Sequence, residues 1–202
     1  MSGAGLSPVA RELFDLPVLV LARRLVGKVL VHETEAGIAA GRIVETEAYR
    51  GPEDLAAHSA RGRRTKRTEA MFGPPGRAYM FLLYGTSWAF NVVSGREDVP
   101  HAVLVRALEP LVGLELMASR RKRAATAREL TNGPGKLTQA LGIDGAAYGV
   151  DLARGKLRLC EGKAGPIGRS PRINIDYAGP WVTRPWRFFE KGNRHVSVAP
   201  RI

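Results

Sequence analysis

The sequence predicts a single α+β domain built on a largely antiparallel sheet. The chain has 202 residues, of which 45% are hydrophobic, so it suits one compact domain with a substantial core. Runs of alternating β-branched residues occupy much of the first half, and segments with helical spacing precede and follow them. No internal repeat or long low-complexity linker divides the chain, so we expect one domain over residues 1–202.

The N-terminal segment predicts two short helices followed by a hairpin. Leucine, valine and phenylalanine alternate with charged residues over residues 7–25, which suits one helix starting at Ser7 and Pro8 and a second entered at Pro17. β-Branched residues then alternate over residues 27–33 and 39–49. The polar residues 32–37 between them are typical of a turn, so we expect these two strands to pair.

Further strands and helices are expected along the rest of the chain. Residues 78–83, 88–93 and 102–108 are apolar runs bounded by Gly, Pro or Asn, which is typical of strands. Glu109 and Pro110 open a segment with helical spacing, and Asn132 is a candidate cap for a short helix that ends near Leu141. The tail over residues 155–198 predicts short strands with Gly and Pro breaks, including a polar loop at 165–171.

The charge balance predicts a polyanionic partner. Lys and Arg number 31 against 19 Asp and Glu, which gives a formal net charge of +12. Nucleic acid is the favoured partner, and an anionic membrane surface or acidic proteins remain as alternatives.

Cysteine usage and hydropathy narrow the class of protein. Cys160 is the only cysteine, which excludes an intrachain disulfide, a cysteine-based structural zinc site and an iron–sulfur cluster. The N-terminus has no basic segment followed by an apolar one, and the apolar run 16–21 is too short to cross a bilayer. We therefore expect a cytoplasmic protein without a membrane segment.

The densest polar cluster begins in the strand that ends near Tyr49. Period-two alternation predicts that Ile43, Glu45, Glu47 and Tyr49 share one face of this strand. A strand face that begins apolar and ends in two carboxylates is unusual for a core element, because a buried unpaired carboxylate is costly. This face is therefore a candidate catalytic site, and a solvated acidic edge strand is the alternative.

The same cluster also permits a metal-dependent nuclease. Carboxylate oxygens and an imidazole nitrogen are ligands of divalent ions, and the cluster supplies candidates in Glu45, Glu47, Glu53, Asp54 and His58. The spacing matches no specific metal motif. Glu53 and Asp54 also suit the acidic first turn of a helix.

Aromatic and basic residues follow the polar cluster. Tyr79 and Phe81 share a strand face, and Tyr84 lies at a turn with Gly85, where a ring is placed to wedge into a duplex. Trp88 and Phe90 are better explained as core residues. The runs 61–67 and 120–123 are strongly basic and suit phosphate contacts, with solvated surface as the alternative.

Together these motifs resemble the alkyladenine DNA glycosylase family, also called 3-methyladenine DNA glycosylases. The resemblance rests on residues 41–49, 51–54 and 56–59, and extends through 83–85, Asn91 and 104–110 to 133–137. It covers most of the chain, from about Pro17 to Val198, and is weakest in the N-terminus and in residues 145–171.

The resemblance implies a curved antiparallel sheet flanked by helices, no metal or other cofactor, and a base-flipping pocket. Glu47 matches the general base, and Arg106 matches an arginine near it. Tyr84 matches the residue that intercalates in the DNA. The pocket residues matched are Tyr49, His58, Phe81, Asn91 and Leu104, and the candidate contacts to the DNA backbone are Arg63, Arg64, Lys66, Arg67 and Lys136.

The implied activity is monofunctional hydrolysis of an N-glycosidic bond in base excision repair. The substrate is double-stranded DNA with damaged purines, such as 3-methyladenine and 7-methylguanine, and deaminated or etheno purines are further candidates. The implied enzyme is a monomer that leaves an abasic site. Phe81 stands where many relatives have a tyrosine, and Thr86 and Ser87 replace bulkier residues in some relatives. The resemblance therefore does not define the range of substrates or the contacts of the intercalation loop with DNA. A non-catalytic nucleic-acid or ribosome-associated binder is the rival class, but it leaves Glu47 unexplained.

Overall fold

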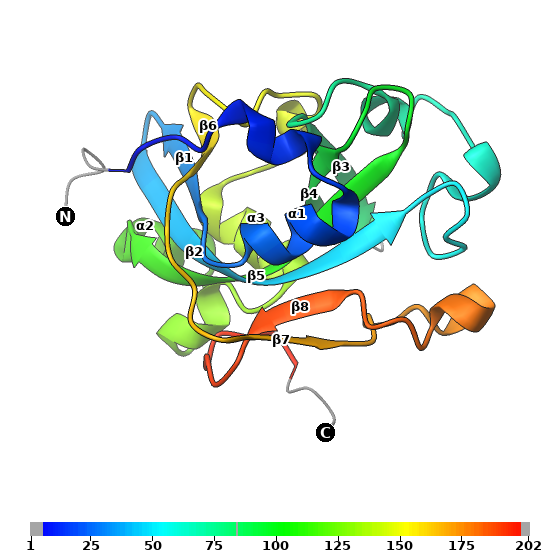
Figure 1. Ribbon diagram of the computed structural model, residues 1–202. Coiled ribbons are helices and arrows are strands. Elements are labelled where there is room, and N and C mark those ends of the chain that lie inside the picture. Colours follow the sequence, from blue (N-terminus) through cyan, green and yellow to red (C-terminus); the bar gives the residue numbers. More distant parts are fainter. Residues whose placement is uncertain (1–5, 84, 199–202) are drawn as a thin grey trace.

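The computed structural model describes residues 6–83 and 85–198, which form one α+β fold around an eight-stranded antiparallel sheet that does not close into a barrel (Figure 1). Six strands follow the order β3-β4-β5-β2-β1-β6, while β8 pairs with β2 and β7. The predicted fold class is thus confirmed. The strands are β1 (Val29–Thr34), β2 (Gly37–Arg50), β3 (Ala78–Leu83), β4 (Ser87–Ser94), β5 (His101–Val112), β6 (Leu157–Cys160), β7 (Ile167–Ser170) and β8 (Arg187–Glu190).

Three α-helices flank the sheet, and α1 and α3 share the main hydrophobic core with it. That core includes the fully buried side chains of Phe14, Leu21, Phe90 and Leu137. The helices are α1 (Val18–Leu25), α2 (Leu114–Arg120) and α3 (Pro134–Leu141), and 3₁₀ turns occur at η1 (Arg11–Asp15), η2 (Ala60–Gly62), η3 (Glu69–Phe72), η4 (Ala127–Leu130), η5 (Gly145–Ala147) and η6 (Asp176–Trp181). In the described parts of the chain, no helix has the length and apolar character needed to cross a membrane.

The expected helix at Ser7 and Pro8 is wrong. Pro8 forms an isolated bridge with Cys160, and the first helical turn, η1, begins at Arg11. Val9 donates its backbone N–H to the carbonyl of Leu159, so pairing with the sheet satisfies this backbone in place of a helix. The second helix begins directly after Pro17, as predicted.

Two helix starts in the second half also differ from the prediction. Glu109 and Pro110 belong to β5, where they pair with Arg42 and Gly41 of the long strand β2. The helix begins only after Gly113, whose φ of 76° breaks the strand. At α3 the N-cap residue is Gly133 and Pro134 is the first helical residue, so Asn132 is not the cap. Its side chain accepts a hydrogen bond from Nζ of Lys136 instead, at 3.0 Å.

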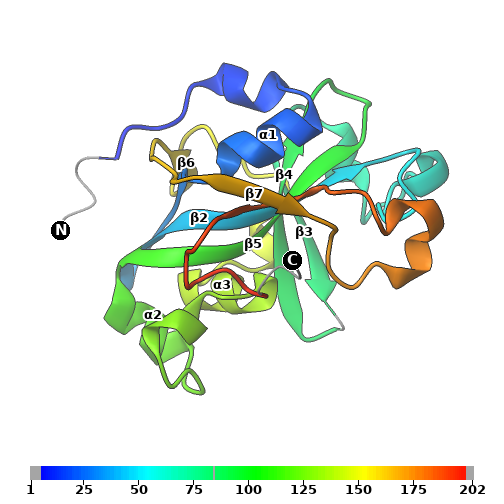
Figure 2. The ribbon, with the colours of Figure 1, turned by 60° about the horizontal axis from the view of Figure 1, so that its bottom comes forward.

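The polar loop expected at residues 165–171 contains strand β7. β7 pairs with β8, and β8 pairs with β2, so β7 continues the sheet beyond β8; Figure 2 views the fold from this side, with β7 in front. Gly168 and Ser170 are buried residues in this arrangement. The local sequence gave no strand signal because β7 is short and depends on pairing with β8, which is distant in the chain.

Of the three register shifts between β2 and β5, two are β-bulges at the polar cluster. In the pairing of β2 with β5, Ile43 faces Leu108 and Glu45 faces Ala107, so Val44 is an extra residue in β2. Thr46 pairs with Val105, which leaves Arg106 as an extra residue in β5. A bulge reverses the alternation of side chains and re-aims them.

The bulge in β2 corrects the predicted face of this strand. Ile43 packs in the main core with α1, and Val44 packs in a separate cluster with Phe189. Ile43 therefore does not share the face of Glu45 and Glu47. Thr46 donates to the carbonyl of Ala22 in α1, which places α1 on the side of β2 opposite the two carboxylates.

Candidate active site

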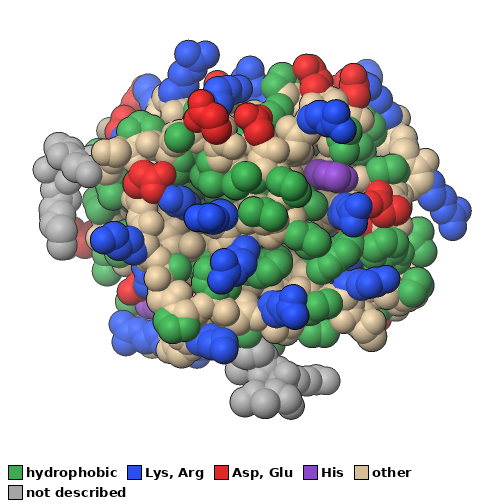
Figure 3. All heavy atoms as spheres, in the orientation of Figure 1, with side chains coloured by type: hydrophobic (Ala, Val, Ile, Leu, Met, Phe, Trp, Pro, Cys, Tyr) green, Lys and Arg blue, Asp and Glu red, His purple; other side chains and the backbone are tan. Residues whose placement is uncertain are grey.

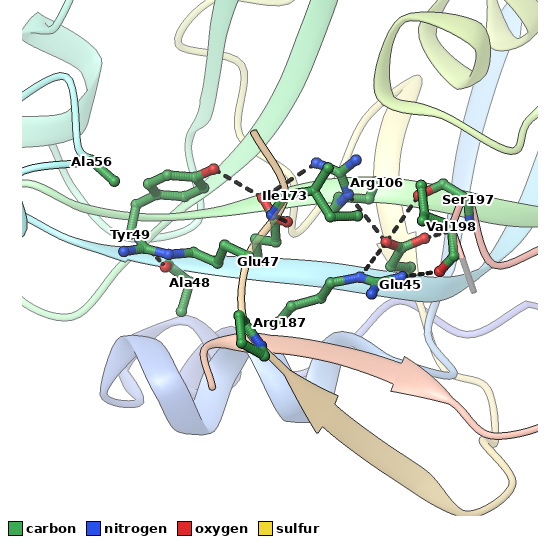
Figure 4. A network of polar contacts seen from close by, with 12 residues as sticks. Glu45, Glu47, Ala48, Tyr49, Ala56, Arg106, Ile173, Arg187, Ser197 and Val198 are labelled. Carbon is green, nitrogen blue, oxygen red and sulfur yellow. Dashed lines mark hydrogen bonds and ion pairs between the residues drawn. The ribbon is translucent and has the colours of Figure 1, made fainter. Parts of the chain in front are cut away.

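Glu47 lies at the centre of a buried polar network. Its side chain is fully removed from solvent. One carboxylate oxygen, Oε2, accepts hydrogen bonds from the Tyr49 hydroxyl at 2.9 Å and from Nη1 of Arg106 at 3.3 Å. The other, Oε1, accepts the backbone N–H of Ile173 at 2.8 Å. Figure 4 shows Arg106 between Glu47 and Glu45, with Ile173 reaching Glu47 from a distant segment of the chain.

Glu45 is held by a different set of partners. It accepts hydrogen bonds from Nε of Arg106 at 3.1 Å, from Nε of Arg187 at 2.7 Å, and from both the backbone N–H and the hydroxyl of Ser197 at 2.6 and 2.9 Å. Most of these groups lie in the C-terminal part of the chain. Glu45 therefore fastens β8 and the segment after it to the sheet, and it fixes the guanidinium of Arg106 beside Glu47.

A cavity of about 430 Å³ lies beside this network. Its volume falls in the range of ligand pockets in proteins, about 300–1,000 Å³. Glu47 itself does not line the cavity, but Tyr49, Arg106 and Ile173, which hydrogen-bond to it, all do. All three hydrogen-bond partners of Glu47 line the cavity, whereas Arg187 and Ser197, which bind Glu45, do not.

Aromatic rings form one wall of the cavity. The rings of His58 and Phe81 meet edge to face with centroids 4.4 Å apart, and both residues line the cavity. Nδ1 of His58 lies 2.8 Å from the hydroxyl of Tyr79, which is buried between them and the protein interior. Burial, with the nearby charges of Arg67 and Arg63, lowers the pKa of His58 to about 4, so the ring is neutral at pH 7.

The remaining predicted pocket residues also reach the cavity. Asn91 and Leu104 are buried residues of β4 and β5 that line it. The side-chain amide of Asn91 donates to the carbonyl of Tyr79 at 3.0 Å, which fixes its orientation. The structure thus brings all five predicted pocket residues to one cavity, with Glu47 and Arg106 beside it. Tyr84 lies outside the described residues.

Two buried residues that sequence reasoning did not assign to the pocket support Tyr49. Arg172 forms a two-pronged ion pair with Asp54, with N–O distances of 2.5 and 2.9 Å, and both side chains are fully buried. The guanidinium lies 4.7 Å from the centre of the Tyr49 ring and 5.1 Å from that of Trp186. Arg172 also precedes Ile173, whose N–H binds Glu47. Arg172 lies in a Gly- and Pro-rich stretch that also contains Arg169, and the local sequence does not distinguish the two.

Burial, and then the charge of Glu47, raises the pKa of Tyr49 well above its ordinary value. Its hydroxyl therefore keeps its proton at pH 7 and donates a hydrogen bond to Glu47. Tyr49 lines the cavity and its hydroxyl contacts the carboxylate, so one side chain connects the cavity with Glu47.

The carboxylates of the acidic cluster form ion pairs with arginines. Glu45, Glu47 and Asp54 pair with Arg187, Arg106 and Arg172, respectively, and Glu53 pairs with Arg50. Residues 6–83 and 85–198 contain no group of three or more His, Cys, Asp or Glu side chains placed to hold a metal ion. Each of these carboxylates therefore already has an arginine as its counter-ion.

The basic residues predicted to contact DNA have different surroundings. Arg64 is engaged by Glu69 and Asp98, whereas Arg63 and Lys66 are exposed. Lys136 binds the side chain of Asn132, and Arg67 reaches the cavity wall. Figure 3 shows Lys and Arg side chains also spread over the face that carries α1, β7 and β8, so the positive charge is not confined to one patch.

The fold places a buried, hydrogen-bonded carboxylate beside an aromatic cavity, and comparison with known proteins gives the family of the chain. The model of the methylpurine-DNA glycosylase family matches residues 12–194. Relatives from Bacillus licheniformis and Bacillus subtilis are 50% and 47% identical, cover 94% and 95% of this chain and match over 96% and 97% of their own lengths. A relative from Desulfitobacterium hafniense is 46% identical, with 94% of this chain and 98% of the relative covered. All three are provisionally named 3-methyladenine DNA glycosylases.

The chain belongs to the methylpurine-DNA glycosylase family. It is a DNA glycosylase, a hydrolase of N-glycosyl bonds that acts in DNA repair. The family resemblance seen in the sequence is confirmed.

Proposed function

We propose that this glycosylase removes N3- and N7-alkylated purines, such as 3-methyladenine and 7-methylguanine, from double-stranded DNA. Glu47 is the general base in this proposal, and the product is an abasic site in an intact strand. The observation that carries the proposal is the buried carboxylate of Glu47, whose hydrogen-bond partners Tyr49, Arg106 and Ile173 all line an aromatic cavity.

The cavity wall suits a flat cationic ring. An N3- or N7-alkylated purine carries positive charge while it is still attached to the sugar. The faces of Tyr49 and Phe81 attract such a cation, and a neutral His58 does not repel it. A base inside a duplex cannot reach this cavity, so the nucleotide must first be extruded, which costs least at a damaged pair.

The hydrolytic step uses the groups around Glu47. The bond from the sugar carbon to the purine nitrogen breaks, and its electron pair neutralises the leaving base. The oxygen of a water molecule bonds to the sugar carbon and gives its proton to Glu47, whose negative charge also stabilises the cationic sugar; such general-base help is worth about 10² to 10⁴ in rate. Arg106 orients the carboxylate.

A water nucleophile implies a monofunctional enzyme. Among the described residues that line the cavity there is no lysine whose amine could attack the sugar instead. Neutral leaving groups such as hypoxanthine and ethenoadenine need a proton on departure, and His58 with a pKa of about 4 is not charged to supply it. We therefore expect slower excision of deaminated and etheno purines.

Contact with DNA completes the proposal. Tyr84 fills the place of the extruded base, and the basic residues Arg63, Arg64, Lys66, Arg67 and Lys136 contact phosphates. The enzyme acts as a monomeric single domain over residues 1–202. We place it in the cytoplasm, where the free thiol of the buried Cys160 stays reduced.

The test is an excision assay with duplexes that each carry one lesion, followed by alkali cleavage of abasic sites. We expect cleavage after alkali at alkylated purines, unchanged by excess EDTA, and no protein–DNA adduct after borohydride. Strand cleavage without alkali that stops with EDTA would instead support a metal-dependent nuclease. Binding without any cleavage would support a non-catalytic binder.

A further inference from the structure

We propose that Arg67 is a gate of the base pocket: in the free protein its guanidinium occupies the place beside Phe81 and His58, and a phosphate of the bound strand draws it out. This inference rests on the proposed function and adds to it a residue that sets which bases enter. It gives Arg67 a role in specificity as well as in DNA affinity.

The first observation is the position of the guanidinium. Its carbon Cζ lies 5.4 Å from the centre of the Phe81 ring, and Nη2 lies 3.2 Å from Nε2 of His58. Arg67 lines both the 430 Å³ cavity and an adjoining hollow of about 350 Å³, which it shares with His58 and Arg63. The side chain thus stands at the boundary between the pocket and the outer surface, against rings on which a base would stack.

The second observation is that the charge of Arg67 is not neutralised. In the described part of the chain no carboxylate lies within ion-pair distance of Arg67, although Arg64, three residues earlier, binds both Glu69 and Asp98. An exposed cation without a carboxylate partner is free to exchange its weak contacts with aromatic rings for a charge-assisted bond to phosphate. Arg64, in contrast, must first give up its two carboxylate partners before it can contact a phosphate.

The third observation is that only the side chain has to move. The hydroxyl of Tyr148 lies 3.3 Å from the backbone carbonyl of Arg67 and 3.1 Å from that of Lys66, and it accepts the backbone N–H of Ala70 at 2.8 Å. These bonds hold the backbone of the loop, so withdrawal of Arg67 requires only a rotation of its side chain that breaks the contacts with His58 and Phe81.

Departure of the Arg67 guanidinium from the pocket has two chemical consequences. Arginine can only donate hydrogen bonds, so Nε2 of the neutral His58 ring is the acceptor and Nδ1 donates to the hydroxyl of Tyr79. Departure of Arg67 therefore exposes an unoccupied acceptor, His58 Nε2, to a donor on the flipped base. It also removes a fixed positive charge that repels a cationic purine.

Two substitutions of Arg67 test the role of its charge, because glutamine removes the charge and lysine keeps it. Arg67→Gln lacks the charge that returns to the pocket whenever the phosphate releases the side chain. We therefore expect the ratio of single-turnover excision of 7-methylguanine to that of hypoxanthine to rise by about two- to threefold, because a positive charge beside the rings repels the cationic base and not the neutral one. The dependence of log Kd on log salt should also become shallower by about one phosphate contact. Arg67→Lys should keep the salt dependence, and the control Arg169→Gln, at an exposed position of β7, should change neither the excision ratio nor the salt dependence.

A second readout does not depend on catalysis. The chain has 4 histidines, so the ring signals of His58 can be assigned by NMR. We expect Arg67→Gln to raise the pKa of His58, and undamaged duplex to shift the wild-type His58 signals toward those of free Arg67→Gln. Unchanged His58 signals on DNA binding together with a wild-type excision ratio in Arg67→Gln would overturn the gate. Failure of the wild-type protein to excise any lesion would instead overturn the proposed function.

Discussion

Arg172 and Asp54 form an ion pair from which solvent is completely excluded, and the guanidinium of Arg172 lies 4.7 Å from the centre of the Tyr49 ring. Asp54 also accepts the backbone N–H groups of Arg50 and Ala56, at 3.1 and 3.0 Å. The pair therefore connects the turn after β2 with the segment that carries Ile173. It supports the Tyr49 ring from behind and positions the Ile173 N–H toward Glu47.

Removing one member of this pair should destabilise the protein strongly. We expect Arg172→Met to lower the free energy of unfolding by about 3–5 kcal/mol, because it leaves the carboxylate of Asp54 buried without its partner. Urea unfolding measures this. Arg169→Met, at an exposed position of β7, is the matched control and should stay within about 0.5 kcal/mol of wild type. Equal stability of the two variants would contradict the role given to the pair.

Tyr49 should contribute through its ring and its hydroxyl separately. Tyr49→Phe keeps the ring in the pocket and removes one donor to Glu47, so excision should slow by about three- to tenfold, as expected for one net hydrogen bond. Tyr49→Leu removes the aromatic face as well and should slow excision further. Single-turnover rates on a 7-methylguanine duplex compare the two, and identical rates for both variants would argue against stacking on this ring.

The lowered pKa of His58 has a consequence for stability. Its folded-state value of about 4 lies below the ordinary value of 6.5, so the unfolded chain binds the proton more readily. The contribution of His58 is thus fully present above pH 6.5 and is lost as the pH falls toward 4, by up to about 1 kcal/mol per pH unit.

Urea unfolding of wild type and His58→Gln at pH 7 and pH 5 isolates this contribution. Burial also lowers the pKa values of His101 and His195, but those residues are present in both proteins. The wild-type protein should lose more stability than the variant between the two pH values. A parallel loss would mean that His58 titrates normally in the folded protein.

Glu45 and Glu47 should differ in what they support. Glu45→Gln disturbs contacts with Arg106, Arg187 and Ser197, so we expect a large loss of stability, of about 3 kcal/mol or more. Glu47→Gln keeps an acceptor for Tyr49 and should cost less. Thermal unfolding of the two variants gives the order, and a less stable Glu47→Gln would reverse the assignment of roles.

Local patterns predicted much of the sheet but not its details. Residues 78–83 match β3, because alternation and bounding Gly or Pro residues are local signals. The bulges at Val44 and Arg106 carry no local signal, since they arise from the pairing of β2 with β5. They moved Ile43 to the other face of β2 and directed Arg106 at Glu45 and Glu47.

The site was predictable where its residues are contiguous. Glu47 and Tyr49 stand two residues apart on one strand, so alternation alone placed them together. Ile173 is separated from Glu47 by 126 residues in the sequence, and Arg172 directly precedes it. Only the tertiary fold brings these two residues to the site. Tyr79 was seen as part of an aromatic cluster, but its contact with His58 depends on the loop after β2.

The most direct test of the central claim is single-turnover excision by Glu47→Gln on a duplex with one 7-methylguanine. The account predicts that the variant binds the lesion duplex with a Kd near that of wild type but excises the base at least about 10²-fold more slowly. Excision by Glu47→Gln at a rate close to wild type would contradict Glu47 as the general base.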